Sequence, residues 1–565
     1  MKDYDICVIG SGAGGGPIAF EAAKAGLSVV VLEKGPWFKQ DDFYKDELTC
    51  CHRRVFRSSN KLEPQVIDER LADGAWSALP TSDPRSGHDF WNGNCVGGSS
   101  NFMSGHFYRK KPDDFRLLSA FGPITGANIA DWPIDYAAME PYYAKVETEV
   151  GISGRVVPHR FAEPRSTPDF PYPPTNEHLI SSWVDKACTD LGLTAIPTPR
   201  AILSRPAMNR RSCEYSGFCG SYGCSTGAKG SARAALLNRA LATGHCEVRP
   251  HAQVYKLEND NNGRVTAAHY FDREGERRRV DARIYVVACQ AIESSRLLLL
   301  STGPKHPHGL GNNHGQVGRN LVFTAGGQGA GHIPYRDVDP NLVDQLRQIG
   351  PFVNRGVQDY YYLDDPALGG HAKGGNIDFL LNSSNYLVRA VMERYDGQGK
   401  LVWGTTLKRR LEEVFTRNRI MRFEVFCDWL PHDDCFVTLD PKIKDQWGVP
   451  VSHVRIAPHP HNEKVARRLA TPAKAVLEKM GFREVNVDIN QSPPPNLQAG
   501  GCRFGKDPAT SVLDPDCRIH DCENAYVSDG SFMPTGGSVT FTWTIYANAF
   551  RVADRILARF PRTAG

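Results

Sequence analysis

Several features that would place the 565-residue chain in other classes of protein are missing from its sequence. No apolar run approaches the roughly 20 residues needed to cross a bilayer, so we expect no membrane span. The formal net charge is only +4, and the longest basic cluster, residues 408–410, stands beside two glutamates. This pattern is typical of a solvated helix face, so we expect no nucleic-acid partner.

We also expect no export signal and no disulfide framework. Its first residues show no charged region, apolar region and cleavage site in succession. The fifteen cysteines are odd in number, and Cys7 and Cys289 stand in apolar segments typical of buried thiols in a reducing compartment. We therefore expect a cytoplasmic protein. The alternative is a periplasmic one, exported in the folded state with a partner that carries a signal.

Segments of strand–helix character occur in three separated parts of the chain: residues 1–35, about 230–300 and about 520–560. A single α/β layer assembled from distant segments would produce this pattern. Aromatic and alternating apolar residues between about 320 and 490 predict a second, more antiparallel sheet. The sequence thus predicts a nucleotide-binding domain in residues 1–320 with cap or insert segments within about 40–230, a second domain in 321–494, and a return to the first domain in 495–565.

A nucleotide-binding motif follows the first predicted strand. Residues 4–9 form a short apolar run, and residues 10–15 read GSGAGG, a G-x-G-x-x-G motif. Gly10 permits a tight turn, Gly12 lets the backbone approach a pyrophosphate, and Gly15 lets the next helix pack closely on the strand. The N-terminus of that helix would offer free N–H groups to the diphosphate.

A second apolar run, residues 27–32, ends at Glu33. An acidic side chain in this position can accept hydrogen bonds from ribose hydroxyls and disfavours a 2′-phosphate. The succession of strand, glycine motif, helix, second strand and acidic residue therefore predicts a dinucleotide-binding site. NAD and FAD share this fingerprint, which leaves the choice between them open.

Further segments resemble the glucose–methanol–choline (GMC) oxidoreductase family. Residues 94–101 (NCVGGSSN) are similar to the family's glycine–serine loop beside the flavin, and residues 286–294 (VVACQAIES) to a strand–turn that packs on the nucleotide. The other similar segments are residues 131–134 (DWPI), 140–143 (EPYY), 524–531 (NAYVSDGS) and the helix that ends at 551–554. Within the family, the chain most resembles the large subunits of gluconate-type and related sugar or alcohol dehydrogenases.

The resemblance implies FAD, a Rossmann-like FAD-binding domain built from discontinuous segments, and a substrate-binding domain with an antiparallel sheet. It also implies oxidation of an alcohol, polyol or sugar by hydride transfer to flavin. Some family members attach flavin through a histidine where this chain has Phe102, so we expect non-covalent FAD. The predicted cofactor-binding residues are Gly10, Gly12, Ala13, Gly15, Glu33, Gly97, Gly98, Ser99, Asn101, Val254, Asp529, Gly530 and Thr540.

The resemblance fails where alcohol-oxidising members keep a histidine and then a second histidine or an asparagine. Leu497 stands at the first position and Thr540 at the second. The chemistry needs a base, because the hydroxyl loses its proton as hydride leaves the carbinol carbon. Leucine cannot take a proton, and a threonine hydroxyl is at best a hydrogen-bond partner.

Three explanations for the missing base stay open. The register could differ by one residue, which would place Gln498 or Asn496 in the pocket, although neither is a base. Another histidine could serve, although each also fits an ordinary surface or structural role; the candidates are His106, His459, His461 and His520. Finally, the chain could oxidise a non-alcohol group, or be a non-catalytic FAD-binding subunit that serves assembly.

Three cysteines, Cys213, Cys219 and Cys224, lie within twelve residues and are separated by glycines. Thiolates at such spacings can ligate a 3Fe–4S cluster. The next segment, residues 226–231, resembles dehydrogenase subunits that pass electrons from flavin through such a cluster to a cytochrome partner. Packing of three small thiols is the other interpretation, and both stay open. Zinc is disfavoured because no fourth ligand is close in sequence.

Overall fold

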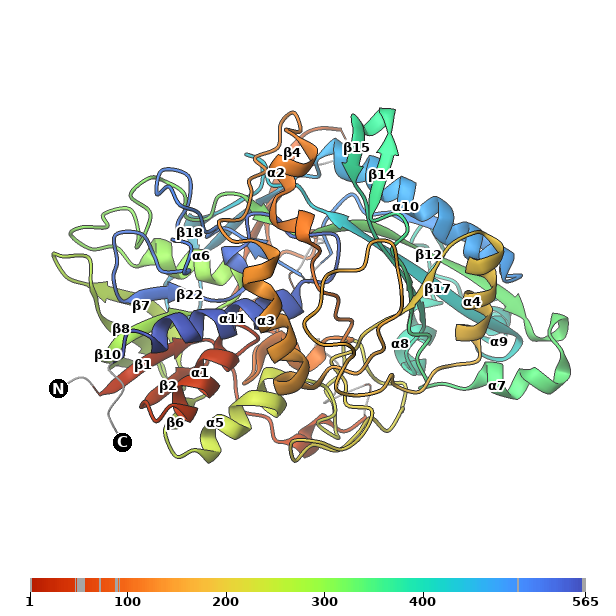
Figure 1. Cartoon of the computed structure of the whole chain (residues 1–565), viewed down its shortest axis with the longest axis horizontal. Helices are drawn as coiled ribbons and strands as arrows, with labels where there is room; N and C mark the ends of the chain where they lie inside the picture. Colours follow the sequence, from red (N-terminus) through yellow and green to blue (C-terminus); the bar gives the residue numbers. More distant parts are fainter. Residues whose placement is uncertain are drawn as a thin grey trace.

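The computed structural model shows two sheets of different type, joined side by side (Figure 1). The structure describes residues 3–45, 47, 56–70, 73–86, 90, 92–494 and 497–560. Among these residues, we find no helix with the length and apolar character of a membrane span.

The first sheet has five strands in the order β22-β10-β1-β2-β6, and every neighbouring pair is parallel. Its strands are β1 (Tyr4–Ile9), β2 (Val29–Leu32), β6 (Cys246–Arg249), β10 (Ala282–Val287) and β22 (Ala525–Val527). The apolar run Ile6–Val8 is fully buried, as expected for a parallel strand covered on both faces. The sheet combines the beginning, middle and end of the chain, which confirms the predicted assembly from discontinuous segments.

Helices from both ends of the chain cover this sheet. α1 (Gly15–Lys24) packs against α11 (Thr542–Leu557), and α11 packs in turn against α3 (Tyr136–Val146). The Trp543 indole N–H donates to the Tyr143 carbonyl at 3.2 Å, and the Tyr143 and Thr544 hydroxyl oxygens lie 2.9 Å apart. The C-terminal helix is therefore an integral part of the nucleotide-binding layer.

The second sheet has six strands in the order β20-β12-β17-β16-β13-β5, and its neighbours are antiparallel, as predicted. Its strands are β5 (Ala195–Pro197), β12 (Thr324–Pro334), β13 (Arg355–Val357), β16 (Gly375–Leu381), β17 (Asn418–Asp428) and β20 (Arg483–Ile489). The long helix α10 (Pro460–Lys479) buries Val465, Leu469 and Val476 against this sheet. The other face is left free to border a cavity.

Smaller elements complete the described chain. A four-stranded sheet, β18-β19-β3-β4, joins β3 from the predicted insert region to β19 from the predicted substrate domain. The domain limits at 320 and 494 stay a prediction. The remaining elements are β3 (Val66–Arg70), β4 (Trp76–Pro80), β7 (Gln253–Asn259), β8 (Val265–Phe271), β9 (Arg277–Val280), β11 (Leu321–Val322), β14 (Tyr362–Asp365), β15 (Gly370–Lys373), β18 (Phe436–Lys444), β19 (Pro450–Ile456), β21 (Ala499–Gly500), α2 (Leu117–Phe121), α4 (Ile180–Asp190), α5 (Asn238–Ala242), α6 (Ala291–Leu300), α7 (Val343–Arg347), α8 (Tyr386–Met392) and α9 (Gly404–Glu412).

Candidate functional site

A cavity of about 1360 Å³ is lined by residues of both sheets. On one side lie the ends of β1, β2 and the β10 turn, and on the other side lie residues of β12, β17 and β20. In parallel α/β sheets, ligands bind beyond the carboxyl ends of the strands, which is where this cavity meets the first sheet.

The glycine loop after β1 forms one wall. Gly10 has a φ of +97°, and a Cβ atom there would collide with the carbonyl of Ala288, the residue that follows β10. A Cβ on Gly12 would meet no atom of the described residues within 4 Å. The space beside Gly12 lies before the N-terminus of α1, where backbone N–H groups attract an anion. This cradle fits the diphosphate of FAD.

Glu33 lies at the end of β2 and is buried. Its Oε2 accepts hydrogen bonds from the Ser11 hydroxyl (2.5 Å) and N–H (3.1 Å), and its Oε1 accepts from the Gly35 N–H (3.0 Å). Burial raises the pKa of Glu33 although these bonds favour its charged form. The Gly97 N–H donates to the Ser11 hydroxyl at 2.8 Å, so Glu33 also ties the two glycine loops together.

The glycine–serine loop forms the adjoining wall, where Gly98, Ser99 and Phe102 line the cavity. Asn101 fixes the loop from behind, because its side-chain amide donates to the carbonyls of Val96 (2.9 Å) and Gly98 (3.1 Å). The apolar Phe102 ring offers no nucleophile to a flavin, which supports the expectation of non-covalent binding.

The segment 524–531 near the C-terminus also borders the part of the cavity beside the glycine loops. Asp529 is buried, and its Oδ2 accepts hydrogen bonds from the Gln290 N–H (2.9 Å) and from the Ser294 hydroxyl. Burial raises the pKa of Asp529, although its hydrogen bonds oppose that effect. The predicted cofactor residues that line the cavity are Gly10, Gly12, Ala13, Glu33, Gly98, Ser99, Val254, Asp529, Gly530 and Thr540. Gly15, Gly97 and Asn101 support the loops from outside that lining.

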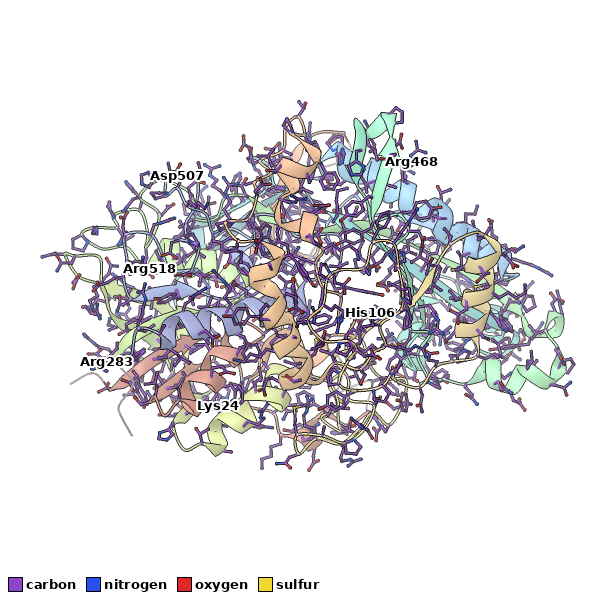
Figure 2. The ribbon with its side chains drawn as sticks, in the orientation of Figure 1. Lys24, His106, Arg283, Arg468, Asp507 and Arg518 are labelled. Atoms are coloured by element: carbon purple, nitrogen blue, oxygen red, sulfur yellow. The ribbon has the colours of Figure 1, made fainter. Side chains whose placement is uncertain are left out.

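The same cavity also holds the positions where the family's base is missing. Leu497, Gln498 and Thr540 all line it, and Leu497 has a left-handed φ of +61°. The Thr540 hydroxyl donates to the backbone carbonyl of His106 at 2.8 Å, so this histidine stands beside the family position. Figure 2 shows His106 in the central part of the molecule, between the regions of the two sheets.

The other candidate residues lie elsewhere. The His459 Nδ1 accepts the His461 N–H at the start of α10, and the His520 Nε2 lies 3.0 Å from the Ser511 hydroxyl oxygen. None of these three histidines lines the cavity. Asn496 lies outside the described residues. Of the four candidate histidines, the structure therefore brings His106 alone to the pocket.

Sequence reasoning missed the neighbour of His106. The His106 Nδ1 lies 3.4 Å from the Oδ2 atom of Asp378 on β16, and the Asp378 side chain is only 1% exposed. An acid between two apolar residues of a strand was the available signal, because a buried carboxylate needs partners.

The three clustered cysteines also line the cavity. Among the described residues, no group of three or more His, Cys, Asp or Glu side chains could hold a metal ion. The Cys213 sulfur accepts the Tyr215 N–H at 3.4 Å, while the Cys224 sulfur lies 3.4 Å from the Thr226 hydroxyl oxygen. Burial raises the pKa of the Cys213 thiol to about 12. The structure thus gives no support to the iron–sulfur interpretation.

Two family models, both described as GMC oxidoreductase, match residues 85–324 and 431–549. A 2-methyl-1,2-propanediol dehydrogenase of Mycolicibacterium austroafricanum is 31% identical over 98% of this chain and 95% of its own. The chain belongs to the GMC oxidoreductase family. With a nucleotide cradle of the type described above, this GMC protein is an FAD-dependent oxidoreductase.

Other relatives extend the comparison. The 6'''-hydroxyparomomycin C oxidase of Streptomyces lividus is 30% identical over 98% of this chain and 91% of its own. The fructose dehydrogenase large subunit of Gluconobacter japonicus is 26% identical over 98% of this chain and 97% of its own. The structure of pyridoxine 4-oxidase from Mesorbium loti covers 99% of this GMC protein and 100% of its own chain, with a TM-score of 0.62 at 15% identity. That likeness confirms the fold.

Proposed function

We propose that this protein oxidises a hydroxyl group of a small alcohol, polyol or sugar to a carbonyl group. The observation that carries the proposal is the cavity, which joins a nucleotide cradle to a polar pocket. The relatives point the same way, since they are named as a propanediol dehydrogenase, a 6'''-hydroxyparomomycin C oxidase and a fructose dehydrogenase large subunit. When bound, FAD supplies the hydride acceptor.

The wall formed by β12, β17 and β20 favours a substrate with several polar groups. Gln328, Arg422, Glu424, Asn486 and Asp488 all line the cavity. The Arg422 guanidinium donates to the Gln328 side-chain oxygen at 2.5 Å, which holds both groups on the same wall. Side-chain donors and acceptors arranged in this way match the hydroxyls of a polyol or sugar better than an unsubstituted alkyl chain.

The test is anaerobic bleaching of the oxidised flavin absorption by a panel of sugars, polyols, simple alcohols, acids and amines. We expect at least one sugar or polyol to bleach the flavin within seconds, and simple alkanols to react more slowly. Bleaching by acids or amines alone would replace the proposal with oxidation of a non-alcohol group. A flavin that no member of the panel bleaches would favour the non-catalytic subunit.

We further propose a partner protein, such as an electron-transfer subunit or cytochrome, as the final electron acceptor. Support comes from the relative named as a dehydrogenase large subunit. Mixing the reduced protein with either oxygen or a ferricenium salt tests this, and we expect much faster reoxidation by ferricenium.

A reducing, cytoplasmic location is also proposed, since all thirteen cysteines of the described chain are free thiols. Co-export with a signal-bearing partner is the alternative.

A further inference from the structure

We propose that His106 is the catalytic base of the reaction and that Asp378 positions it. The inference rests on the proposed function and supplies the group that the sequence lacks at Leu497 and Thr540. His106 lies on the loop that follows the glycine–serine segment, not on the C-terminal block where the family resemblance would place the base.

Several contacts fix the backbone of His106 at the cavity wall. Its carbonyl accepts the Thr540 hydroxyl at 2.8 Å, and His106 forms a β-bridge with Arg200. The Phe107 N–H donates to the Pro199 carbonyl at 3.0 Å. Thr540 therefore does not serve as the base but stabilises the loop that contains His106.

The side chain of His106 is oriented by a carboxylate that is itself held in place. Asp378 Oδ1 accepts the Tyr108 hydroxyl at 2.6 Å, and its Oδ2 accepts the Asn376 amide at 3.0 Å. The 3.4 Å separation of His106 Nδ1 from Asp378 Oδ2 is long for a hydrogen bond, as is common before substrate binds. Within the described chain, no hydrogen bond occupies the His106 Nε2, which is left to accept a proton.

Oxidation of the alcohol removes one proton and one hydride from the substrate. The substrate O–H bond breaks and its proton goes to the His106 Nε2, while the C–H bond breaks and its carbon gives up a hydride that carries both electrons. FAD, held at the glycine loops, would supply the acceptor for this hydride. The C–O bond becomes a C=O bond. The resulting imidazolium is stabilised by the buried Asp378 carboxylate, in the manner of a histidine oriented by an acid.

The first experiment compares His106→Gln with His371→Gln. His371 offers a matched control, because its Nδ1 lies 2.8 Å from Asp364 but the pair is exposed and does not line the cavity. With the best alcohol of the panel, we expect His106→Gln to slow flavin reduction at least ~100-fold, the lower end of the range for a general base. His371→Gln should match the wild type, and both variants should keep one FAD per chain.

A positioning role for Asp378 predicts a different signature. We expect Asp378→Asn to lower the limiting rate of flavin reduction roughly tenfold while the half-saturating alcohol concentration stays unchanged. Equal reduction rates in the wild type and His106→Gln would overturn the assignment of the base and leave the proposed function intact. If no alcohol bleaches the wild-type flavin, the proposed function fails first.

Chemical modification tests, without turnover, whether the His106 Nε2 is free to react. Diethyl pyrocarbonate acylates accessible, unprotonated imidazole nitrogens, and peptide mass spectrometry locates the label. We expect the His106 peptide of the holoenzyme to carry one label, which disappears in His106→Gln. An unlabelled His106 beside a labelled His371 would contradict a free acceptor nitrogen in the cavity.

Discussion

Gly10 and Gly12 stand two residues apart in the same loop, and a methyl group added to each would meet different surroundings. At Gly10 it would collide with the Ala288 backbone, and the φ of +97° is strained for any other residue. At Gly12 it would project into the space that a diphosphate would occupy. Packing of the chain thus requires glycine at position 10, and we propose that the ligand requires it at position 12.

Alanine at each position should separate these two requirements. We expect Gly10→Ala to reduce soluble, folded protein, because the β1 turn cannot form without displacing β10. We expect Gly12→Ala to fold with a normal circular dichroism spectrum but to bind FAD at least ~10-fold more weakly, measured by flavin fluorescence titration. Equal FAD affinity in Gly12→Ala and the wild type would show that the diphosphate does not approach this loop.

Residues close in sequence were predictable, and residues paired across the fold were not. Gly10, Gly12 and Glu33 line the cavity, and their local spacing predicts this placement because they follow two adjacent parallel strands. The neighbours His106 and Asp378 are separated by 272 positions, and only the fold brings them together. Likewise, cysteine spacing alone suggested a cluster, but spacing does not determine where the sulfur atoms point.

At the scale of elements, a buried histidine, His178, lies two residues before the first residue of helix α4. The His178 Nδ1 accepts the Ile180 N–H at 3.1 Å, and burial lowers the pKa of His178 to about 4. The ordinary value for histidine is 6.5. The unfolded chain therefore binds the proton between these two values, while the folded chain does not.

The stability of the protein should consequently fall as the pH falls below 6.5. Between pH 7 and pH 5, His178 should cost about 2 kcal/mol of folding free energy. Asn in place of His178 can accept the same N–H without titrating. Denaturant unfolding gives the free energy of unfolding of the wild type and of His178→Asn at each pH. We expect the wild type to lose about this amount of stability relative to the variant when the pH falls from 7 to 5. A difference independent of pH would rule out the neutral buried imidazole.

The parallel and antiparallel sheets themselves were predictable from patterning, since continuous apolar runs and alternating runs differ in sequence. The partners of their edge strands were not. Strand β5 joins the antiparallel sheet from the predicted insert region, and β3 pairs with β19 across more than 380 positions. Such pairings depend on packing of the whole chain and leave no local signature.

At the scale of the whole molecule, the cavity connects both sheets, so cofactor binding should stabilise them together. We expect removal of FAD to lower the melting temperature of the protein in a single transition. Readdition of FAD at about 100 times its dissociation constant should restore about 2.7 kcal/mol. Gly12→Ala at the same FAD concentration should regain less. Two separate transitions, only one of them sensitive to FAD, would show that the sheets unfold independently.

The pairing of β22 with β10 and of α11 with α1 has a consequence for synthesis of the chain. At roughly 5–20 residues per second, β22 leaves the ribosome about half a minute to two minutes after β1. Throughout that time the glycine loop exists without the Asp529 segment that closes the nucleotide end of the cavity. A nascent chain stopped before residue 525 therefore lacks the Asp529 segment of the cavity wall, and we expect FAD to bind finished chains more tightly than unfinished ones.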